Sequence, residues 1–223
     1  MGRHDSFAEE HSMKSTFSCV AAIAVGLTCC TGWAGAAADT VAQGTALKPV
    51  TAFATISDTG LRSVALFIEA GKVIQSPRCQ NCHPVGRRPT QGDDLHAHVP
   101  LMHAGSEGRG SDALPCKSCH GPANHATLAP SIPSIPGNPR WGLAPASMAW
   151  QGSSLGEICA QIKDPKRNGG LSLAQIQRHM GTDDLVGWAW RPGEGRKPAP
   201  GTQVEFGRLI QAWIESGAHC PTS

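Results

Sequence analysis

Tyrosine is absent from this sequence of 223 residues, and phenylalanine occurs only five times. Glycine (26 residues) and proline (17 residues) are frequent instead, which favours a chain rich in loops with short helices. Charged residues make up only 16% of the chain and the formal net charge is +2, so the composition indicates no nucleic-acid partner. A core poor in aromatic side chains needs additional links, and the nine cysteines are the residues that could supply them.

The longest hydrophobic run, "FSCVAAIAVGLTCC", lies near the N-terminus after Lys14. It has the length of a signal-peptide core and is short for a membrane-spanning helix. Ala36 and Ala38 fit a cleavage site before Asp39, so we expect residues 1–38 to be a signal peptide for export to the periplasm, with a retained anchor as the alternative. No second such run follows, so we expect no membrane span in the mature chain. The cysteines that remain, in an oxidising compartment, are Cys79, Cys82, Cys116, Cys119, Cys159 and Cys220.

The pattern C-x-x-C-H occurs twice, as "CQNCH" from Cys79 and as "CKSCH" from Cys116, 37 residues apart. A redox dithiol would need one C-x-x-C beside a βαβ pattern, which the sequence lacks. A zinc site could use the four cysteines, but it leaves the histidine after each pair unexplained. Covalent attachment of haem c uses all three residues of each motif. Cysteines at i and i+3 share one face of a helical turn, and the histidine then reaches the iron from the same side. The sequence therefore predicts two covalent haems.

Each motif then has defined roles, and the short spacing leaves no room for two complete cytochrome domains in tandem. We expect a loop-rich, mostly α fold, with short helices packed around both haems in a single dihaem cytochrome c domain over residues 59–223, preceded by a wrap or linker over 39–58. The predicted attachment cysteines are Cys79 and Cys82 for one haem and Cys116 and Cys119 for the other, with His83 and His120 as the proximal iron ligands.

Each haem iron needs a sixth ligand or keeps an open position. The segment "QGDDLHAHVPLMHAG" follows the first motif, and its crowded histidines make His98 a first candidate distal ligand for either haem and His96 a further one. The alternative for this segment is a solvated polar loop. His179 is the other first candidate, because it borders the apolar stripe of a predicted helix where a haem face could pack. A histidine at the end of a helix also interacts favourably with the helix dipole, which is the alternative for His179.

Apolar periodicity predicts helices over residues 61–76, 153–164, 171–181 and 202–220, and residues 84–150 are expected to be mostly loop. Two of the helices should begin with capping boxes, Ser154 with Glu157 and Ser172 with Gln175. In the first helix, the residues expected on the buried face are Leu61, Val64, Ala65 and Ile68. Cys159 and Cys220 are the two cysteines outside the motifs, and in an oxidising compartment we expect them to form a disulfide.

Several stretches resemble one bacterial family. They are "CHPVGRRPTQGDDLHAH", "GNPRWGLAPASMAW", "ICAQIKDPKRNGGLSLAQIQRHMGTDDLVGWAW" and "FGRLIQAWIESGAHCP", which lie within residues 70–221. They are similar to the exported c-type cytochromes named as isoquinoline 1-oxidoreductase subunits. The resemblance implies a redox partner of the molybdenum hydroxylase type. The chain itself has no molybdenum or iron–sulfur motif, so it can supply only the cytochrome part. The family pattern also implies matching places for His96, His98, His179, Cys159 and Cys220.

Two functions remain open at the level of sequence. The first is electron transfer, in which the chain accepts electrons from an exported oxidoreductase and passes them to the respiratory chain without chemistry of its own. The second is a dihaem enzyme of the peroxidase type, with one open iron. Dihaem peroxidases carry their two motifs on separate domains, much farther apart, and the surplus of histidines here favours closed coordination. The sequence therefore favours the electron carrier, an oxidoreductase subunit with no catalytic residues of its own.

Overall fold

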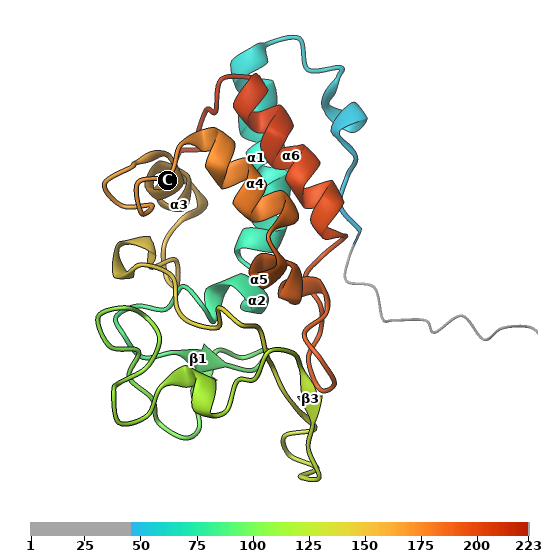
Figure 1. Cartoon of the computed structure of the whole chain (residues 1–223). Coiled ribbons are helices and arrows are strands. Elements are labelled where there is room, and N and C mark those ends of the chain that lie inside the picture. Colours follow the sequence, from blue (N-terminus) through green and yellow to red (C-terminus); the bar gives the residue numbers. More distant parts are fainter. Residues whose placement is uncertain (1–45, 223) are drawn as a thin grey trace, which may run out of the picture. The chain divides into compact units, whose positions relative to one another are not determined.

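The computed structural model describes residues 46–222 (Figure 1). The predicted signal peptide over residues 1–38 and the first part of the predicted wrap over 39–58 lie outside the described residues. The rest of that wrap contains a short 3-10 helix, η1 (Val50–Phe53), and it buries the side chains of Leu47 and Phe53. No helix among residues 46–222 is long and apolar enough to cross a membrane.

Local sequence signals explain where the longer helices begin. The Asp58 carboxylate accepts a hydrogen bond from the backbone of Leu61 at the start of the first helix. Both predicted capping boxes are present, and Thr202 with Glu205 forms a third one that the sequence analysis did not predict. The helices that follow these caps are α1 (Thr59–Ile74), α3 (Leu155–Lys163), α4 (Leu173–Thr182) and α6 (Gln203–Glu215).

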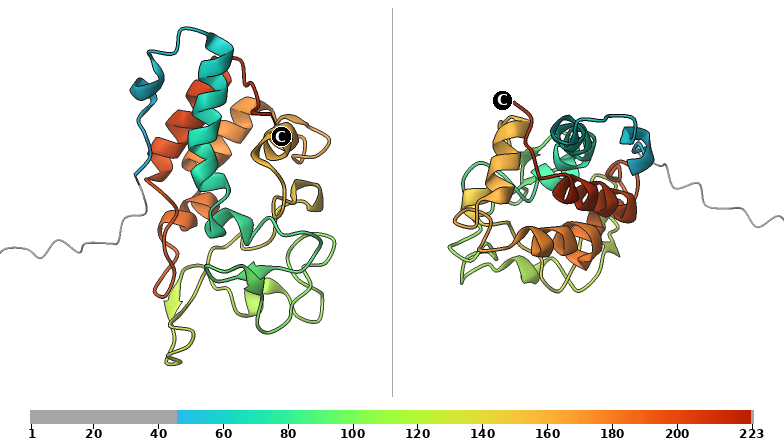
Figure 2. Two further views of the ribbon diagram at one scale, coloured as in Figure 1. Left: turned by 180° about the vertical axis from the view of Figure 1, so that it is seen from behind. Right: turned by 90° about the horizontal axis from the view of Figure 1, so that it is seen from above.

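Helix α6 packs against both α1 and α4, and the three helices lie side by side when seen from behind and from above (Figure 2). The sequence also predicts an apolar stripe along α6. Four of its residues, Phe206, Leu209, Ile210 and Trp213, are buried, whereas the fifth, Ile214, is only partly buried. Glycines allow the closest approach: a Cβ added to Gly207 would lie 2.7 Å from the Cα of Gly181 on α4. Small residues at these two positions therefore set the distance between the helices.

The predicted buried face of α1 is wrong. Leu61 and Ile68 are 64% and 51% exposed, and the buried positions are shifted to include Leu66, Phe67 and Ser63. The Ser63 hydroxyl donates to the carbonyl of Trp213 at 3.1 Å and accepts from the backbone N–H of His219 at 3.0 Å. A serine can therefore occupy the interface with α6, because both of its hydrogen-bonding roles are satisfied there.

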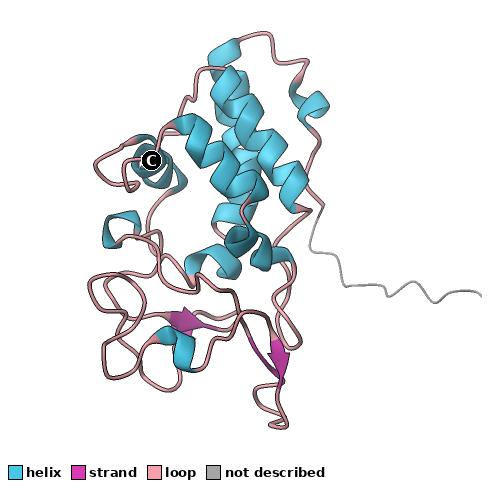
Figure 3. Ribbon diagram, in the orientation of Figure 1, coloured by secondary structure: helices cyan, strands magenta, loops and turns pink. Residues whose placement is uncertain are grey.

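Residues 84–150 form the loop-rich part, as predicted, but they also contain strands (Figure 3). Two antiparallel pairs occur there, β1 (Thr90–Gln91) with β2 (His96–Ala97), and β3 (His125–Ala126) with β4 (Ser134–Ile135). The chain is thus loop-rich and 39% helical with a few short strands, a mixed architecture in place of the mostly α one that we expected. The remaining short elements are α2 (Pro77–Gln80), η2 (Cys116–Ser118), η3 (Ala146–Met148), α5 (Asp184–Gly187) and η4 (Trp188–Trp190).

Cys159 and Cys220 form a disulfide, with a sulfur–sulfur distance of 2.05 Å. This is the pairing that the sequence predicted. Cys159 lies in α3 and is fully buried, and Cys220 follows α6, so the bond fastens the C-terminal segment to α3. The two cysteines are 61 residues apart in sequence, and closing a loop of this length contributes about 2–4 kcal/mol to stability.

Candidate functional site

The first C-x-x-C-H motif begins in α2, at the second residue after the proline that starts that helix. The backbone of His83 donates to the carbonyl of Cys79 at 3.2 Å, so the motif forms a single helical turn. A loop from farther along the chain holds this turn: the backbone of Ala144 donates to the carbonyl of Cys82, and that of Trp150 to the carbonyl of His83. Neither cysteine is disulfide-bonded.

The ring of His83 is fixed in orientation and in protonation. Its Nδ1 lies 2.7 Å from the carbonyl oxygen of Met148, and the ring stacks on Trp150 with centroids 3.5 Å apart. Burial lowers the pKa of His83 to about 4, although the Met148 carbonyl acts in the opposite direction. The imidazole is therefore neutral near pH 7. Because a carbonyl can only accept, Nδ1 carries the proton and the lone pair remains on Nε2.

The second motif has the same construction. Its cysteines lie in and just after η2, and the backbone of His120 donates to the carbonyl of Cys116 at 3.0 Å. The Nδ1 atom of His120 lies 2.7 Å from the carbonyl oxygen of Pro136, and its ring stacks on Trp141 at 4.8 Å. Burial lowers the pKa of His120. This histidine, too, is neutral with its lone pair on Nε2.

Each motif lines its own cavity. Cys116, Cys119 and His120 line one of about 320 Å³, the His120 cavity. Cys79, Cys82 and His83 line another of about 410 Å³, the His83 cavity. Both volumes lie within the range of about 300–1,000 Å³ that is usual for bound cofactors. The two cavities share a wall. The residues that line both of them are Arg78, Cys82, Trp141, Gly142, Leu143 and Trp188.

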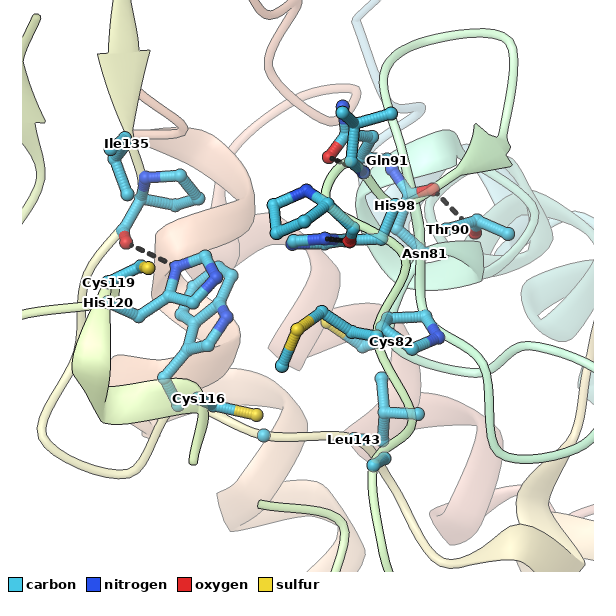
Figure 4. A pocket seen from close by; sticks show the side chains of 18 of the residues that line it. Asn81, Cys82, Thr90, Gln91, His98, Cys116, Cys119, His120, Ile135 and Leu143 are labelled. Carbon is cyan, nitrogen blue, oxygen red and sulfur yellow. Dashed lines mark hydrogen bonds between the residues drawn. The ribbon is translucent and has the colours of Figure 1, made fainter. Parts of the chain in front are cut away.

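A second histidine lines each cavity. In the His120 cavity this is His98, which faces His120 from the opposite wall with ring centroids 5.9 Å apart (Figure 4). The Nδ1 atom of His98 lies 2.9 Å from the carbonyl oxygen of Pro100, which leaves its Nε2 with the lone pair. In the His83 cavity the second histidine is His179 on α4, near enough for its charge to lower the pKa of His83.

The structure does not bring His96 to either cavity. His96 lies on β2 at the surface, and both of its ring nitrogens have partners: Nδ1 lies 2.6 Å from Asp94 and Nε2 lies 3.1 Å from Gln91. Two other side chains with possible ligand atoms, Met102 and His103, do line the His120 cavity. Of the three candidate distal ligands, His98 and His179 are thus the two that line the same cavity as a motif.

The thiols of the first motif are unsuited to redox exchange. Burial raises the pKa of Cys79 to about 12 and that of Cys82 to about 11, whereas exchange-active C-x-x-C cysteines have lowered pKa values. The zinc alternative also lacks its ligand set: among residues 46–222, no three or more His, Cys, Asp or Glu side chains gather as a metal site. These observations argue against the dithiol interpretation of the first motif and against a zinc site formed by both motifs within residues 46–222.

Sequence reasoning missed Arg78, the residue just before Cys79. Its side chain is only 1% exposed, and it forms part of the wall common to both cavities. Its Nη2 donates to the carbonyl of Gly92 and to Asp93, whereas Nε and Nη1 have no hydrogen-bond partner within the described residues. An arginine beside a cysteine motif is unremarkable in a sequence, so only the fold could reveal its burial.

Comparison with protein-family models found no match, and neither the curated proteins nor the solved structures contain a protein that matches this chain. The resemblance to the isoquinoline 1-oxidoreductase subunits therefore stays a prediction from sequence.

Proposed function

We propose that this protein is an exported dihaem c-type cytochrome that transfers electrons. The observation that carries the proposal is the pair of adjoining cavities, each lined by one C-x-x-C-H motif and by a second histidine. When bound, each haem would supply a one-electron iron couple. The two cysteines of each motif would hold the haem covalently, with Cys79 and Cys82 in the His83 cavity and Cys116 and Cys119 in the His120 cavity.

Four of the histidines that line the cavities, His83, His120, His98 and His179, would hold the two haem irons. The hydrogen bonds from Nδ1 of His83 and His120 to backbone carbonyls keep Nε2 free and hold each ring in place. His98, whose ring centroid lies 5.9 Å from that of His120, would hold the same iron as His120. His179 would serve the His83 cavity. Neutral imidazoles bind iron without first losing a proton, so the low pKa of His83 favours ligation.

The surroundings of the cavities support a carrier in preference to an enzyme. Trp150 and Trp141 cover the proximal histidines, and apolar residues such as Met148, Leu143 and Ile176 help to exclude water. Such burial tunes a reduction potential. A histidine opposite each motif favours closed coordination at both irons, whereas the peroxidase alternative needs one open position.

The resemblance seen in the sequence suggests the partner. An exported oxidoreductase of the molybdenum hydroxylase type would donate electrons, and the respiratory chain would receive them. Fold and likeness do not establish a partner, so this part of the proposal rests on association.

Haem content is the first test. A pyridine haemochrome assay on protein purified from the periplasm should give two c-type haems per chain, whereas one haem, or haem extracted by acidic solvent, would contradict the proposal. Next, mixing the oxidised protein with the candidate hydroxylase and its substrate should reduce the haems, and omitting the enzyme should prevent reduction. Rapid turnover of peroxide, or full binding of carbon monoxide at one haem, would favour the peroxidase instead.

A further inference from the structure

Arg78 is a buried cation in the wall that separates the two cavities, and only part of its guanidinium group is used. Asp93 and the carbonyl of Gly92 both bind Nη2. The guanidinium carbon lies 5.9 Å from the ring centre of Trp188, which covers it from one side. Nε and Nη1 have no partner within the described residues. Burial lowers the pKa of Arg78, and Asp93 offsets this effect only in part.

Buried donors without an acceptor are rare in folded proteins, and an unpaired charged group is among the most costly. Nε and Nη1 of Arg78 therefore need a further acceptor, which residues 46–222 do not supply. Asp93, its one carboxylate partner, is 40% exposed and is therefore screened by solvent. Nε–H points to the same side of the guanidinium as Nη2, whereas Nη1 lies beside Cδ, so the two unpaired groups donate in different directions, each to a separate acceptor oxygen. A charged donor forms its strongest hydrogen bonds with the oxygens of a carboxylate. The missing acceptor is thus expected to be a carboxylate that enters one of the cavities.

We propose that Nε and Nη1 of Arg78 donate hydrogen bonds to haem carboxylates, and that the charge of Arg78 raises the reduction potentials of both haems. The inference rests on the proposed function, because the haems bring the carboxylates. The place of Arg78 in the common wall explains why one residue acts on both sites. A buried positive charge favours the arrival of an electron at each iron, and its effect is little screened.

The test compares Arg78→Gln with wild-type protein by potentiometric titration of the haem spectra. Arg78→Gln removes the charge and keeps a polar side chain of similar length. The equilibrium constant for reduction should fall about tenfold at each haem, which corresponds to a decrease of about 59 mV in each potential. The matched control is Arg208→Gln. Arg208 lies on α6, is exposed and lines neither cavity, so both potentials should change much less.

The outcomes separate this inference from the proposed function. If wild-type protein contains no covalent haem, the proposed function fails. If two haems are present but Arg78→Gln leaves both potentials unchanged, or changes only one, the shared role of Arg78 is overturned and the cytochrome assignment stands. Should Arg78→Gln not fold, the crystal structure of the wild-type protein with its haems decides the matter. A haem carboxylate oxygen within hydrogen-bond distance of Nε or Nη1 supports the inference, and its absence there overturns it.

Discussion

At the scale of single side chains, the hydrogen bonds of the ring nitrogens distinguish three of the histidines that line the cavities from His96. In His83, His120 and His98, Nδ1 faces a backbone carbonyl, so the lone pair on Nε2 remains available. In His96 both nitrogens have side-chain partners at the surface. The sequence shows only that these histidines are close together in the chain, because the partners that fix each ring are carbonyl groups of loops.

Replacement of the distal candidates should therefore affect one haem at a time. We expect His98→Ala to convert about half of the low-spin signal to high-spin iron in electron paramagnetic resonance, because one of two irons loses a ligand, and His179→Ala to convert the other half. The control is His96→Ala, which should leave the spectrum of the oxidised protein unchanged. Spectra that stay fully low-spin in both variants would contradict the assignment of His98 and His179.

At the scale of elements, the sequence predicts helices well where the signals are local. The caps at Ser154 and Ser172 and the stripe of α6 depend on residues within a few positions of one another, and all are present. The prediction of the buried face of α1 was wrong because α1 has apolar residues around much of its circumference. Ser63 is buried because its hydroxyl donates to the carbonyl of Trp213 on α6, a contact that local sequence does not reveal. The strand pairs within residues 84–150 are two residues long, too short for a periodic pattern.

The residues of the candidate site also fall into those that local sequence predicts and those that only the fold reveals. The motif cysteines and their histidines follow from a covalent pattern, so they could be named from the sequence. The fold brings distant segments together, and these contacts decide which candidate distal histidine shares a cavity with which motif. The burial of Arg78 depends on the same contacts. Periodicity carries no information about such contacts.

The close approach of α4 and α6 gives a test at this scale. Alanine is favoured over glycine within a helix by about 0.5–1 kcal/mol, so propensity alone predicts that Gly207→Ala stabilises the protein. We expect the opposite, a loss of about 1–3 kcal/mol in the free energy of unfolding, because the new methyl group would meet the backbone of Gly181 at 2.7 Å. Denaturant titration measures the change.

The control for this substitution is Gly60→Ala in α1. An added Cβ there would have only flexible side chains nearby, Asp58 at 3.3 Å and the ring of His219 at 3.9 Å. Its unfolding free energy should change little or rise. If Gly207→Ala raised the free energy of unfolding as much as Gly60→Ala does, the prediction would be contradicted. That result would show that α4 and α6 can move apart without loss of stability.

At the scale of the whole molecule, one covalent bond joins elements that the chain connects only through 61 residues. The disulfide fastens α3 to the segment after α6, and further contacts support the same junction: Lys163 donates to the carbonyl of Ala218 at 2.7 Å, and the indole of Trp213 donates to the carbonyl of His219 at 3.0 Å. The C-terminal segment is thus part of the packed structure.

Removing the bond should cost stability and leave the haem content unchanged. For the double variant Cys159→Ser, Cys220→Ser we expect the free energy of unfolding to fall by about 2–4 kcal/mol, because the unfolded chain gains freedom. Urea titration gives the first quantity and the haemochrome assay the second. Two haems per chain with unchanged stability would show that the bond contributes nothing, and loss of one haem would show that it also shapes a site.

The two cavities draw on very different spans of the chain. Apart from Trp188 and Arg196, all residues of the His120 cavity lie between Arg78 and Leu143, so this site closes over short loops. The His83 cavity joins Ile74 to Phe206 and needs α4 and α6. Contacts between distant residues form late, because closing a long loop costs more entropy. We therefore expect the surroundings of the second motif to form earlier in folding than those of the first motif, which include residues from the C-terminal third of the chain.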